Sequence, residues 1–225
     1  MKTILKILLA AFVLSLTPTV YVCAQGHIET PVERKARQER EAAAKKKKTT
    51  TKNWRELGFF HEGLASVVDA NGKIGFIDKT RKLVIPCKWN DAGAFSEGLV
   101  SVKDANDKWG FIDKMGKVVI PCKWKSVVGF REGLAKVADA NGKWGYIDKT
   151  GKVVISCQWK DAGYFSEGMA WVQDANGKYG YIDKTGKLVI PCTWRWAWIF
   201  DNGRARVDDA NGKSHYIDKT GKIID

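Results

Sequence analysis

The sequence predicts an all-β protein built from repeats, and two observations support this prediction. A fourteen-residue stretch that begins at Asp139 recurs, with near copies beginning at Asp69, Asp104, Asp174 and Asp209, so that the copies are spaced 35 residues apart. Asn-Gly and Thr-Gly pairs inside these copies favour tight hairpin turns. A fixed spacing without insertions indicates one supersecondary unit that is used five times.

Each unit is expected to be a three-stranded antiparallel meander followed by a linking segment. In the second unit, strands are predicted over residues 99–103, 109–112 and 118–124, with Pro121 ending the ladder of the third. Along the first strand, fixed apolar positions alternate with a variable one, which is typical of a strand with one face on a core and one in water. The variable position, expected to face water, holds Ser66, Ser101, Lys136, Trp171 and Arg206.

These units resemble the WG or KWG repeats of secreted and surface bacterial proteins. The resemblance rests on Glu-Gly-Leu, a short strand, and then Asp-x-Asn-Gly-Lys-Trp-Gly-Tyr-Ile-Asp-Lys-Thr-Gly-Lys, and it extends over residues 54–225. The Trp-Gly pair itself occurs at Trp109 and Trp144. The resemblance implies an all-β repeat module and assigns no catalytic residue.

Two arrangements of the five units fit the pattern. In an open twisted array each meander packs only on its neighbours, and the end units act as caps. In a five-bladed propeller the units close around an axis, and Trp54, ahead of the first unit, would match the Pro-Cys-x-Trp tail that the fifth unit lacks. We favour the open array, because three-stranded blades are thinner than the usual four.

A secretory signal peptide is predicted over residues 1–24. Lys2 and Lys6 form a short basic region, the apolar run over residues 7–16 is too short to span a bilayer, and Ala24 suits the last residue before cleavage. We therefore expect an exported protein, located in the periplasm or at the cell surface.

Cys23 leaves a lipoprotein as the alternative, although Val22 before it disfavours lipidation. Residues 25–53 are predicted to be a basic, mostly disordered tether with transient helicity, because they carry almost no apolar side chains. Contact with a membrane is expected only through this N-terminal part, if at all. The formal net charge of +13 lies partly in the tether, and export removes the protein from cytoplasmic nucleic acid, so nucleic acid is not an expected partner.

The repeats carry one cysteine column, Cys87, Cys122, Cys157 and Cys192. We expect free, buried thiols, because equivalent residues of a continuous sheet lie about 14 Å apart, beyond the limit of about 7 Å for a disulfide. No pair has the CxxC spacing of a zinc site, so no metal is expected.

Candidate catalytic chemistry is sparse. His27, His61 and His215 lack a Ser or Cys partner in a recognisable motif. The carboxylates at Glu62 and its equivalents recur in unit after unit, which favours structural roles in turns over glycoside hydrolysis. We therefore expect no enzyme activity and no cofactor.

Residues that depart from the repeat pattern are the better candidates for binding. They lie in the last two units and are Trp171, Trp196, Trp198, Arg204, Arg206 and His215. Clusters of Trp and Arg are typical of protein or sugar recognition, whereas a terminal unit also departs from the pattern because it caps an array. The function expected from this pattern is a non-catalytic module that binds an envelope or extracellular protein, with carbohydrate binding as the alternative.

Overall fold

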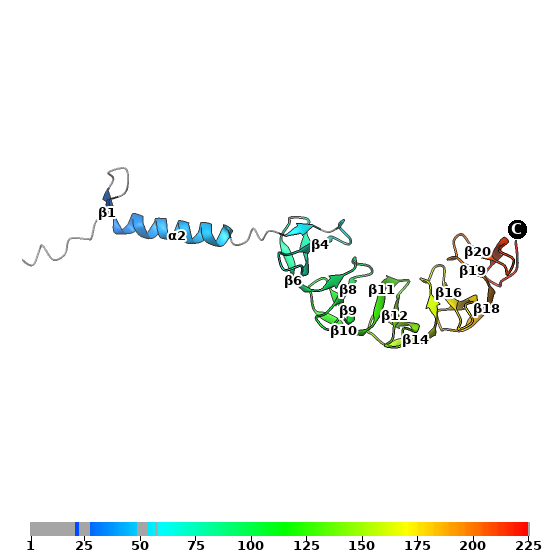
Figure 1. Ribbon diagram of the computed structural model, residues 1–225. Coiled ribbons are helices and arrows are strands. Elements are labelled where there is room, and N and C mark those ends of the chain that lie inside the picture. Colours follow the sequence, from blue (N-terminus) through cyan, green and yellow to red (C-terminus); the bar gives the residue numbers. More distant parts are fainter. Residues whose placement is uncertain (1–20, 23–27, 49–53, 57, 225) are drawn as a thin grey trace, which may run out of the picture. The chain divides into compact units, whose positions relative to one another are not determined.

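The computed structural model describes residues 21–22, 28–48, 54–56 and 58–224 (Figure 1). The chain divides into two compact units, Met1–Lys52 and Asn53–Asp225. The predicted signal peptide lies outside the described residues except for Tyr21 and Val22, and the alternative lipidation site Cys23 also lies outside them.

The N-terminal unit contains a two-stranded sheet, β1 (Tyr21–Val22) and β2 (Ile28–Glu29), and the helix α2 (Pro31–Lys48). Thr30 begins this helix with a capping box, because its hydroxyl accepts a hydrogen bond from Glu33 N (3.3 Å) while the Glu33 carboxylate accepts one from Thr30 N (2.8 Å). A mostly disordered tether is the expectation from the sequence, and this cap, together with many helix-forming residues, accounts for the helix. Among the described helices, none is long and apolar enough to cross a membrane.

The C-terminal part of the chain, Asn53–Asp225, is all-β, as predicted. It contains the five repeats and consists of successive antiparallel sheets. The first sheet contains β3 (Arg55–Glu56), β4 (Leu64–Val68), β5 (Ile74–Asp78) and β6 (Leu83–Trp89). The second contains β7 (Asp91–Ala92), β8 (Leu99–Lys103), β9 (Trp109–Asp113) and β10 (Val118–Trp124). The third contains β11 (Ser126–Arg131), β12 (Leu134–Ala138), β13 (Trp144–Asp148) and β14 (Val153–Trp159).

The fourth sheet contains β15 (Asp161–Ala162), β16 (Met169–Gln173), β17 (Tyr179–Asp183) and β18 (Leu188–Trp194). The fifth contains β19 (Trp196–Ala197), β20 (Arg204–Asp208) and β21 (Ser214–Asp218). The segment predicted to link the meanders supplies the first strand of each sheet, so the first four sheets have four strands and the last has three.

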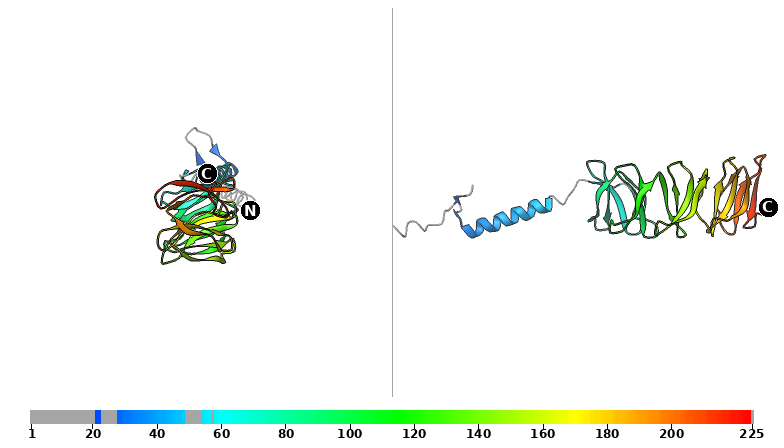
Figure 2. Two further views of the ribbon diagram at one scale, coloured as in Figure 1. Left: turned by 90° about the vertical axis from the view of Figure 1, so that its right-hand side faces the viewer. Right: turned by 90° about the horizontal axis from the view of Figure 1, so that it is seen from below.

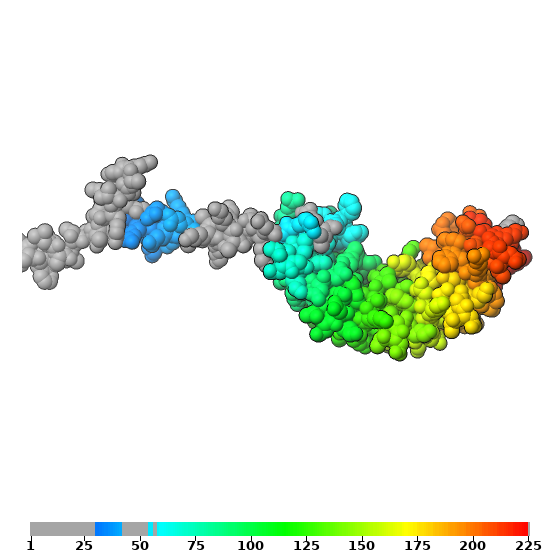
Figure 3. All heavy atoms as spheres, viewed as in Figure 1, coloured from blue at the N-terminus to red at the C-terminus, as the bar shows by residue number. Residues whose placement is uncertain are grey.

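The sheets follow one another along an open arc, and the open array is therefore confirmed (Figures 1 and 3). The last strands, such as β10 and β14, lie on the convex side of the arc, and the edge that begins with strands such as β11 lies toward the concave side. Figure 2 shows the sheets stacked face to face in chain order. This stacking places the first strands and the loops after them along one concave edge.

Both faces of the sheets are packed, which makes the expectation of a water-facing column wrong for the first four units. One buried cluster crosses from the first unit to the second and includes Leu64, Phe76, Ile85, Phe95, Val100, Val102 and Ile112. Ser101, which was expected to face water, is only 7% exposed. The alternation along a strand separates a face that packs on the preceding sheet from one that packs on the next, because stacked sheets bury both sides.

An aromatic pair crosses each interface between neighbouring units. The ring centroids of Phe76 and Phe95 lie 5.2 Å apart, and those of Phe111 and Phe130 lie 4.9 Å apart, with edge-to-face geometry. Tyr146 and Tyr181 continue the column against Phe165 and Phe200, also at 4.9 Å. Each pair contributes about 0.5–1.5 kcal/mol beyond the burial of its area, so these contacts help to hold successive sheets together.

A glycine column allows the second and third strands to approach each other. A Cβ atom on Gly110 would lie 2.5 Å from the carbonyl oxygen of Ile120 and 2.8 Å from the backbone nitrogen of Cys122. His215 occupies the same column in the fifth unit, where no fourth strand is described next to β21. The larger side chain is therefore accommodated only where the neighbouring strand is missing from the sheet.

Pro121 lies inside β10, whose bounds are those of the strand predicted over residues 118–124. β10 is an edge strand, and its register against β9 shifts between Ile120 and Trp124. A residue without an N–H group is tolerated at such an irregularity, because the ladder hydrogen bond is already interrupted there.

The four cysteines of the repeats form no disulfide with one another and are half-buried, each on the third long strand of a different sheet. They are thus in separate stacked sheets, not in the continuous sheet on which the expectation was based. Burial raises the pKa of Cys192 to about 11 and also raises the pKa values of Cys122 and Cys157. Cys122, Cys157 and Cys192 are therefore protonated at neutral pH.

Candidate functional site

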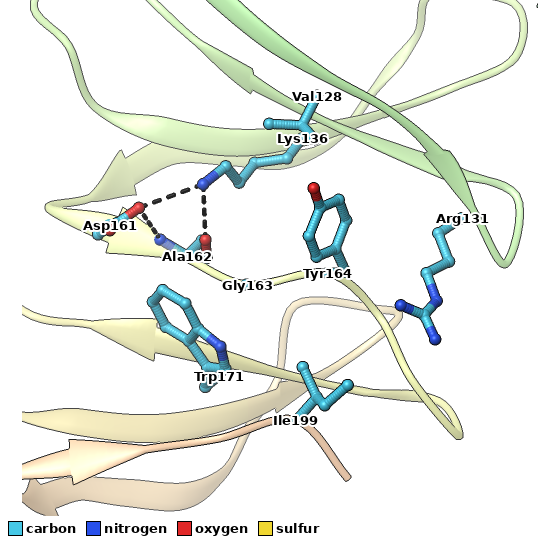
Figure 4. Close-up of a pocket in the computed structure, with 9 residues that line it drawn as sticks. All are labelled: Val128, Arg131, Lys136, Asp161, Ala162, Gly163, Tyr164, Trp171 and Ile199. Carbon is cyan, nitrogen blue, oxygen red and sulfur yellow. Dashed lines mark hydrogen bonds and ion pairs between the residues drawn. The ribbon is translucent and has the colours of Figure 1, made fainter. Parts of the chain in front are cut away.

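A cavity lies between the third and fourth sheets at the concave edge of the repeat domain (Figure 4). Its volume is about 450 Å³, and its lining residues are Val128, Arg131, Lys136, Asp161, Ala162, Gly163, Tyr164, Trp171 and Ile199. We call it the Trp171 pocket. Its walls are mainly aromatic and aliphatic, with three charged side chains among them.

Trp171 reaches this pocket because of its place on β16. Its neighbours Ala170 and Val172 are buried against the third sheet, so the Trp171 side chain lies on the opposite face of β16 and packs against the cluster between the fourth and fifth sheets. A Cβ atom on Gly163 would collide with the Trp171 indole, so glycine at position 163 lets the ring lie against the backbone. The indole thereby forms a flat apolar wall.

The Lys136 ammonium group is satisfied inside the pocket. It donates hydrogen bonds to Ala162 O (2.7 Å) and Asp161 Oδ1 (3.2 Å), and it lies 3.8 Å from the centroid of the Trp144 ring. Arg131, on the opposite side of the pocket in Figure 4, has no ion-pair partner recorded within the described residues. Arg131 is therefore the charged group of the pocket that is open to a ligand.

A second cavity of about 440 Å³, which we call the Trp198 pocket, adjoins the first and shares Arg131 and Ile199 with it. Its other lining residues are Ser166, Trp198, Phe200, Asp201, Arg204, Arg206 and Tyr216. The Arg206 guanidinium lies 4.6 Å from the centroid of the Trp198 ring, and that of Arg204 lies 4.7 Å from the Tyr216 ring. Both are cation–π contacts, so arginine and aromatic side chains alternate on this surface.

Four of the six residues singled out from the sequence line these two pockets: Trp171, Trp198, Arg204 and Arg206. Trp196 is 48% exposed and packs on Tyr179 (5.0 Å) and Trp198 (6.1 Å), next to the Trp198 pocket. His215 lines neither pocket, because it lies beside Asp209 (3.6 Å) and the Trp194 ring (6.5 Å). The surface thus brings together most, but not all, of the candidate residues.

The candidate set lacks most of the lining residues, among them Arg131, Tyr164 and Ile199. The column of Tyr164 and Ile199 holds Phe59, Ala94 and Gly129 in the other units, so it varies as much as the column of Trp171 does. Variation along the loops after the short first strands was the signal that could have identified them.

Arg204, Arg206 and Tyr216 also cap the stack of sheets. Their positions correspond to Leu64, Ser66 and Phe76 of the first unit, which face the next sheet. In the fifth unit this face is exposed, and Tyr216 is 42% exposed. These residues therefore form the outer face of the array as well as one wall of the Trp198 pocket.

The recurring aspartates have a structural role. The Asp78 carboxylate accepts hydrogen bonds from the Thr80 hydroxyl (2.6 Å) and from Lys82 N (3.0 Å), and these bonds lower its pKa. Asp69 binds Asn71 N and Lys73 N in the preceding hairpin (both 2.9 Å). In the described part of the chain, no group of three or more His, Cys, Asp or Glu side chains could hold a metal ion.

Comparison with known proteins identifies the repeat. A family model described as "WG containing repeat" matches residues 74–109, 109–144, 144–179 and 179–213. No curated protein matches the sequence.

The chain is similar to several solved structures, and it spans less than two thirds of the length of some of them. BamB from Moraxella catarrhalis is 16% identical, with a TM-score of 0.44 over 76% of this chain and 62% of BamB. The WD40 β-propeller domain of Doa1 is 14% identical, with a TM-score of 0.40 over 78% of this chain and 68% of that one. PorZ, described as a surface component of the type-IX secretion system of Porphyromonas gingivalis, is 12% identical, with a TM-score of 0.43 over 76% of this chain and 29% of PorZ.

Proposed function

Because the chain belongs to the WG-repeat family, we propose that it is a non-catalytic module that binds another protein at the concave edge of its third to fifth units. One observation supports this proposal most directly. Two adjoining pockets share Arg131 and Ile199, and several of their lining side chains, such as Trp171, depart from the repeat pattern. Side chains that are not needed in every unit are the ones free to serve recognition.

The chemistry of the surface fits a protein ligand. Energetically dominant interface residues are enriched in Trp, Tyr and Arg, and the two pockets combine Trp171, Trp198 and Tyr164 with Arg131. Cavities of about 300–1,000 Å³ hold ligand groups well, and both pockets lie in this range. A partner could insert one apolar side chain into the Trp171 pocket while a carboxylate pairs with Arg131.

The predicted signal peptide supports a partner outside the cytoplasm. An envelope or extracellular protein is therefore the partner that we propose. Lipidation of Cys23 would only change how the module is anchored, because the tether separates that residue from the pockets.

Carbohydrate binding is the second candidate. Tyr164 is 46% exposed and Trp196 is 48% exposed, and exposed aromatic rings are suitable platforms for the apolar face of a sugar. Glycan binding would depend on these rings more than on Arg131, since a neutral sugar gains little from a guanidinium charge.

The experiment compares variants of the full chain in capture from an envelope extract and in binding to cell-wall glycans. Tyr164→Ala and Arg131→Ala are expected to reduce capture of a specific protein at least tenfold. Phe59→Ala is the matched control, because Phe59 occupies the column of Tyr164 in the first unit and is 89% exposed. Equal capture by all three variants would contradict the proposal. Loss of glycan binding in Tyr164→Ala but not in Arg131→Ala would favour the second candidate.

A further inference from the structure

One glutamate column joins each unit to the next. Its members adopt a left-handed backbone conformation and are Glu62 (φ 50°), Glu97 (φ 53°), Glu132 (φ 51°) and Glu167 (φ 52°). Their carboxylates accept hydrogen bonds from the backbone N–H of a glycine in the following unit: Gly98 (3.1 Å), Gly133 (3.1 Å), Gly168 (3.0 Å) and Gly203 (2.9 Å). A left-handed conformation is costly for glutamate, so its recurrence needs such a compensating contact.

A lysine of the following unit completes each site. The ion pairs are Lys114–Glu62 (2.9 Å), Lys149–Glu97 (3.0 Å), Lys184–Glu132 (3.1 Å) and Lys219–Glu167 (3.3 Å). We call the glycine N–H and the lysine Nζ of one unit a carboxylate cradle. Two donors of this kind, one of them charged, bind a carboxylate well.

The first unit contains the same cradle. Gly63 (φ 91°) corresponds to Gly98 (φ 88°), and Lys79 corresponds to Lys114. Lys79 is exposed, and no hydrogen bond or ion pair is recorded for Lys79 Nζ or Gly63 N within residues 54–56 and 58–224. Four copies of this cradle hold a glutamate, and the fifth copy faces away from the other units.

The apolar part of this outer face is already covered. Trp54, one repeat period before Trp89, packs against the buried residues Ala65, Val67 and Ile77. Because Trp54 already covers the apolar side chains of this face, docking here depends on charge and hydrogen bonding at the cradle.

A second copy of this chain is not a suitable occupant. The fifth unit has Asn202 (φ 51°) at the position of the glutamates, and a neutral amide cannot form the ion pair with Lys79. Arg204 stands where the first three units have a leucine after Glu-Gly, and it is exposed. The far end of the array therefore lacks both the charge and the apolar side chain that fit the first unit.

We propose that Gly63 N and Lys79 Nζ form a docking site for a glutamate that a different repeat protein presents in a Glu-Gly turn. The four filled cradles define the ligand chemistry, namely a carboxylate on a left-handed residue that precedes glycine. This site is independent of the two pockets at the concave edge, so either proposal can fail without the other.

The test uses a donor chain that supplies such a turn. The donor is the full chain with Asn202→Glu and Lys79→Glu, and the second change disables its own cradle. Sedimentation velocity is expected to show a one-to-one complex of this donor with the wild-type chain and no self-association of either. The acceptor variant Lys79→Glu should bind the donor at least tenfold more weakly, whereas Lys108→Glu, an equal charge change on another exposed hairpin, should bind as the wild type does.

Equal binding by the Lys79→Glu and wild-type acceptors, or no complex, would overturn the proposal. Self-association of the wild-type chain that Lys79→Glu abolishes would show that a second copy is the occupant, against the proposal. A second measurement does not depend on folding of the donor. Titration of the wild-type chain with sodium acetate should shift the amide resonance of Gly63 but not that of Gly98, and Lys79→Ala should abolish the shift. An unmoved Gly63 resonance would contradict the cradle.

Discussion

The same sequence positions of the repeat hold different kinds of side chain at the interfaces between units and on the outer face of the fifth unit. At the interfaces these positions hold apolar side chains such as Leu99 and Phe111, which are 8% and 0% exposed. On the outer face they hold Arg204 and Tyr216, which are exposed. The backbone is alike in both places, so the presence or absence of a following sheet decides which residues fit.

The glutamate column shows the same contrast. Glu62 and its equivalents reach a glycine and a lysine of the next unit, whereas Asn202 has no following unit to bind in the described chain. Both residues keep the left-handed conformation. The left-handed turn therefore forms whether or not another unit follows, whereas a carboxylate occurs only where a following unit can bind it.

Truncation of an interface aromatic should have the largest effect. Phe111→Ala is expected to lower the free energy of unfolding by about 3–5 kcal/mol, because it leaves a cavity between two stacked sheets. Tyr216→Ala, in the same column on the outer face, should cost less than about 1 kcal/mol, since Tyr216 is half exposed. Urea denaturation followed by tryptophan fluorescence measures both. Equal losses would contradict the distinction between interface and outer face.

Removal of one interface carboxylate should have a smaller effect. Glu97→Ala is expected to cost about 1–3 kcal/mol, because Gly133 N–H loses its acceptor and Lys149 loses its ion pair. Asn202→Ala is the matched control and should change stability by no more than about 0.5 kcal/mol. Hydrogen exchange of the Gly133 amide provides a local measurement. It should accelerate in Glu97→Ala and remain unchanged in the control.

Acid should weaken the same contacts. The hydrogen bond from Lys114, and less strongly the one from Gly98 N, lowers the pKa of Glu62; the hydrogen bond from Gly203 N lowers that of Glu167. A carboxyl group whose pKa is lower in the folded state contributes stability above its unfolded pKa of about 4.3, and loses it as the pH falls through the folded value. Stability should therefore decline as the pH falls below about 5. The double variant Glu62→Gln, Glu167→Gln should show a shallower decline in urea midpoint than the wild type, and an equal slope would count against this cause.

The smallest effect is expected for Arg204→Leu. This change restores the leucine of the interface units on a face that has no sheet to cover it, so the free energy of unfolding should change by no more than about 0.5 kcal/mol. Solubility should fall instead, because the exposed apolar area increases. Static light scattering at increasing protein concentration measures this, and unchanged scattering would show that Arg204 has no capping role.

Much of the architecture was predictable from local patterns. The Asn-Gly and Thr-Gly pairs defined the hairpins, and the fixed 35-residue spacing defined five units. The open array was favoured over a propeller because three strands were expected in each unit, although the first four sheets have four strands. The short first strand of each sheet was not predicted, because a segment of two residues, such as Asp91 and Ala92, is too short to show the alternation of apolar and polar side chains that marks a strand. The candidate residues at the concave edge were partly predicted. Arg131 was missed because it lies in the third unit, outside the last two units that supplied the candidates, and Tyr164 was missed because its column has no fixed residue from which to depart.

The sequence alone determined the repeat, its turns, its family and the positions at which the last unit departs from the others, because these depend on local conformation and spacing. Only the tertiary structure decided that both faces of the first four sheets are buried, that Trp171 and Arg131 line one pocket, and that each glutamate binds the next unit. Those features depend on how sheets 35 residues apart in sequence stack in space. The sequence of a single strand does not reveal its contacts with the neighbouring sheet, because the contacting residues lie one repeat away in the sequence.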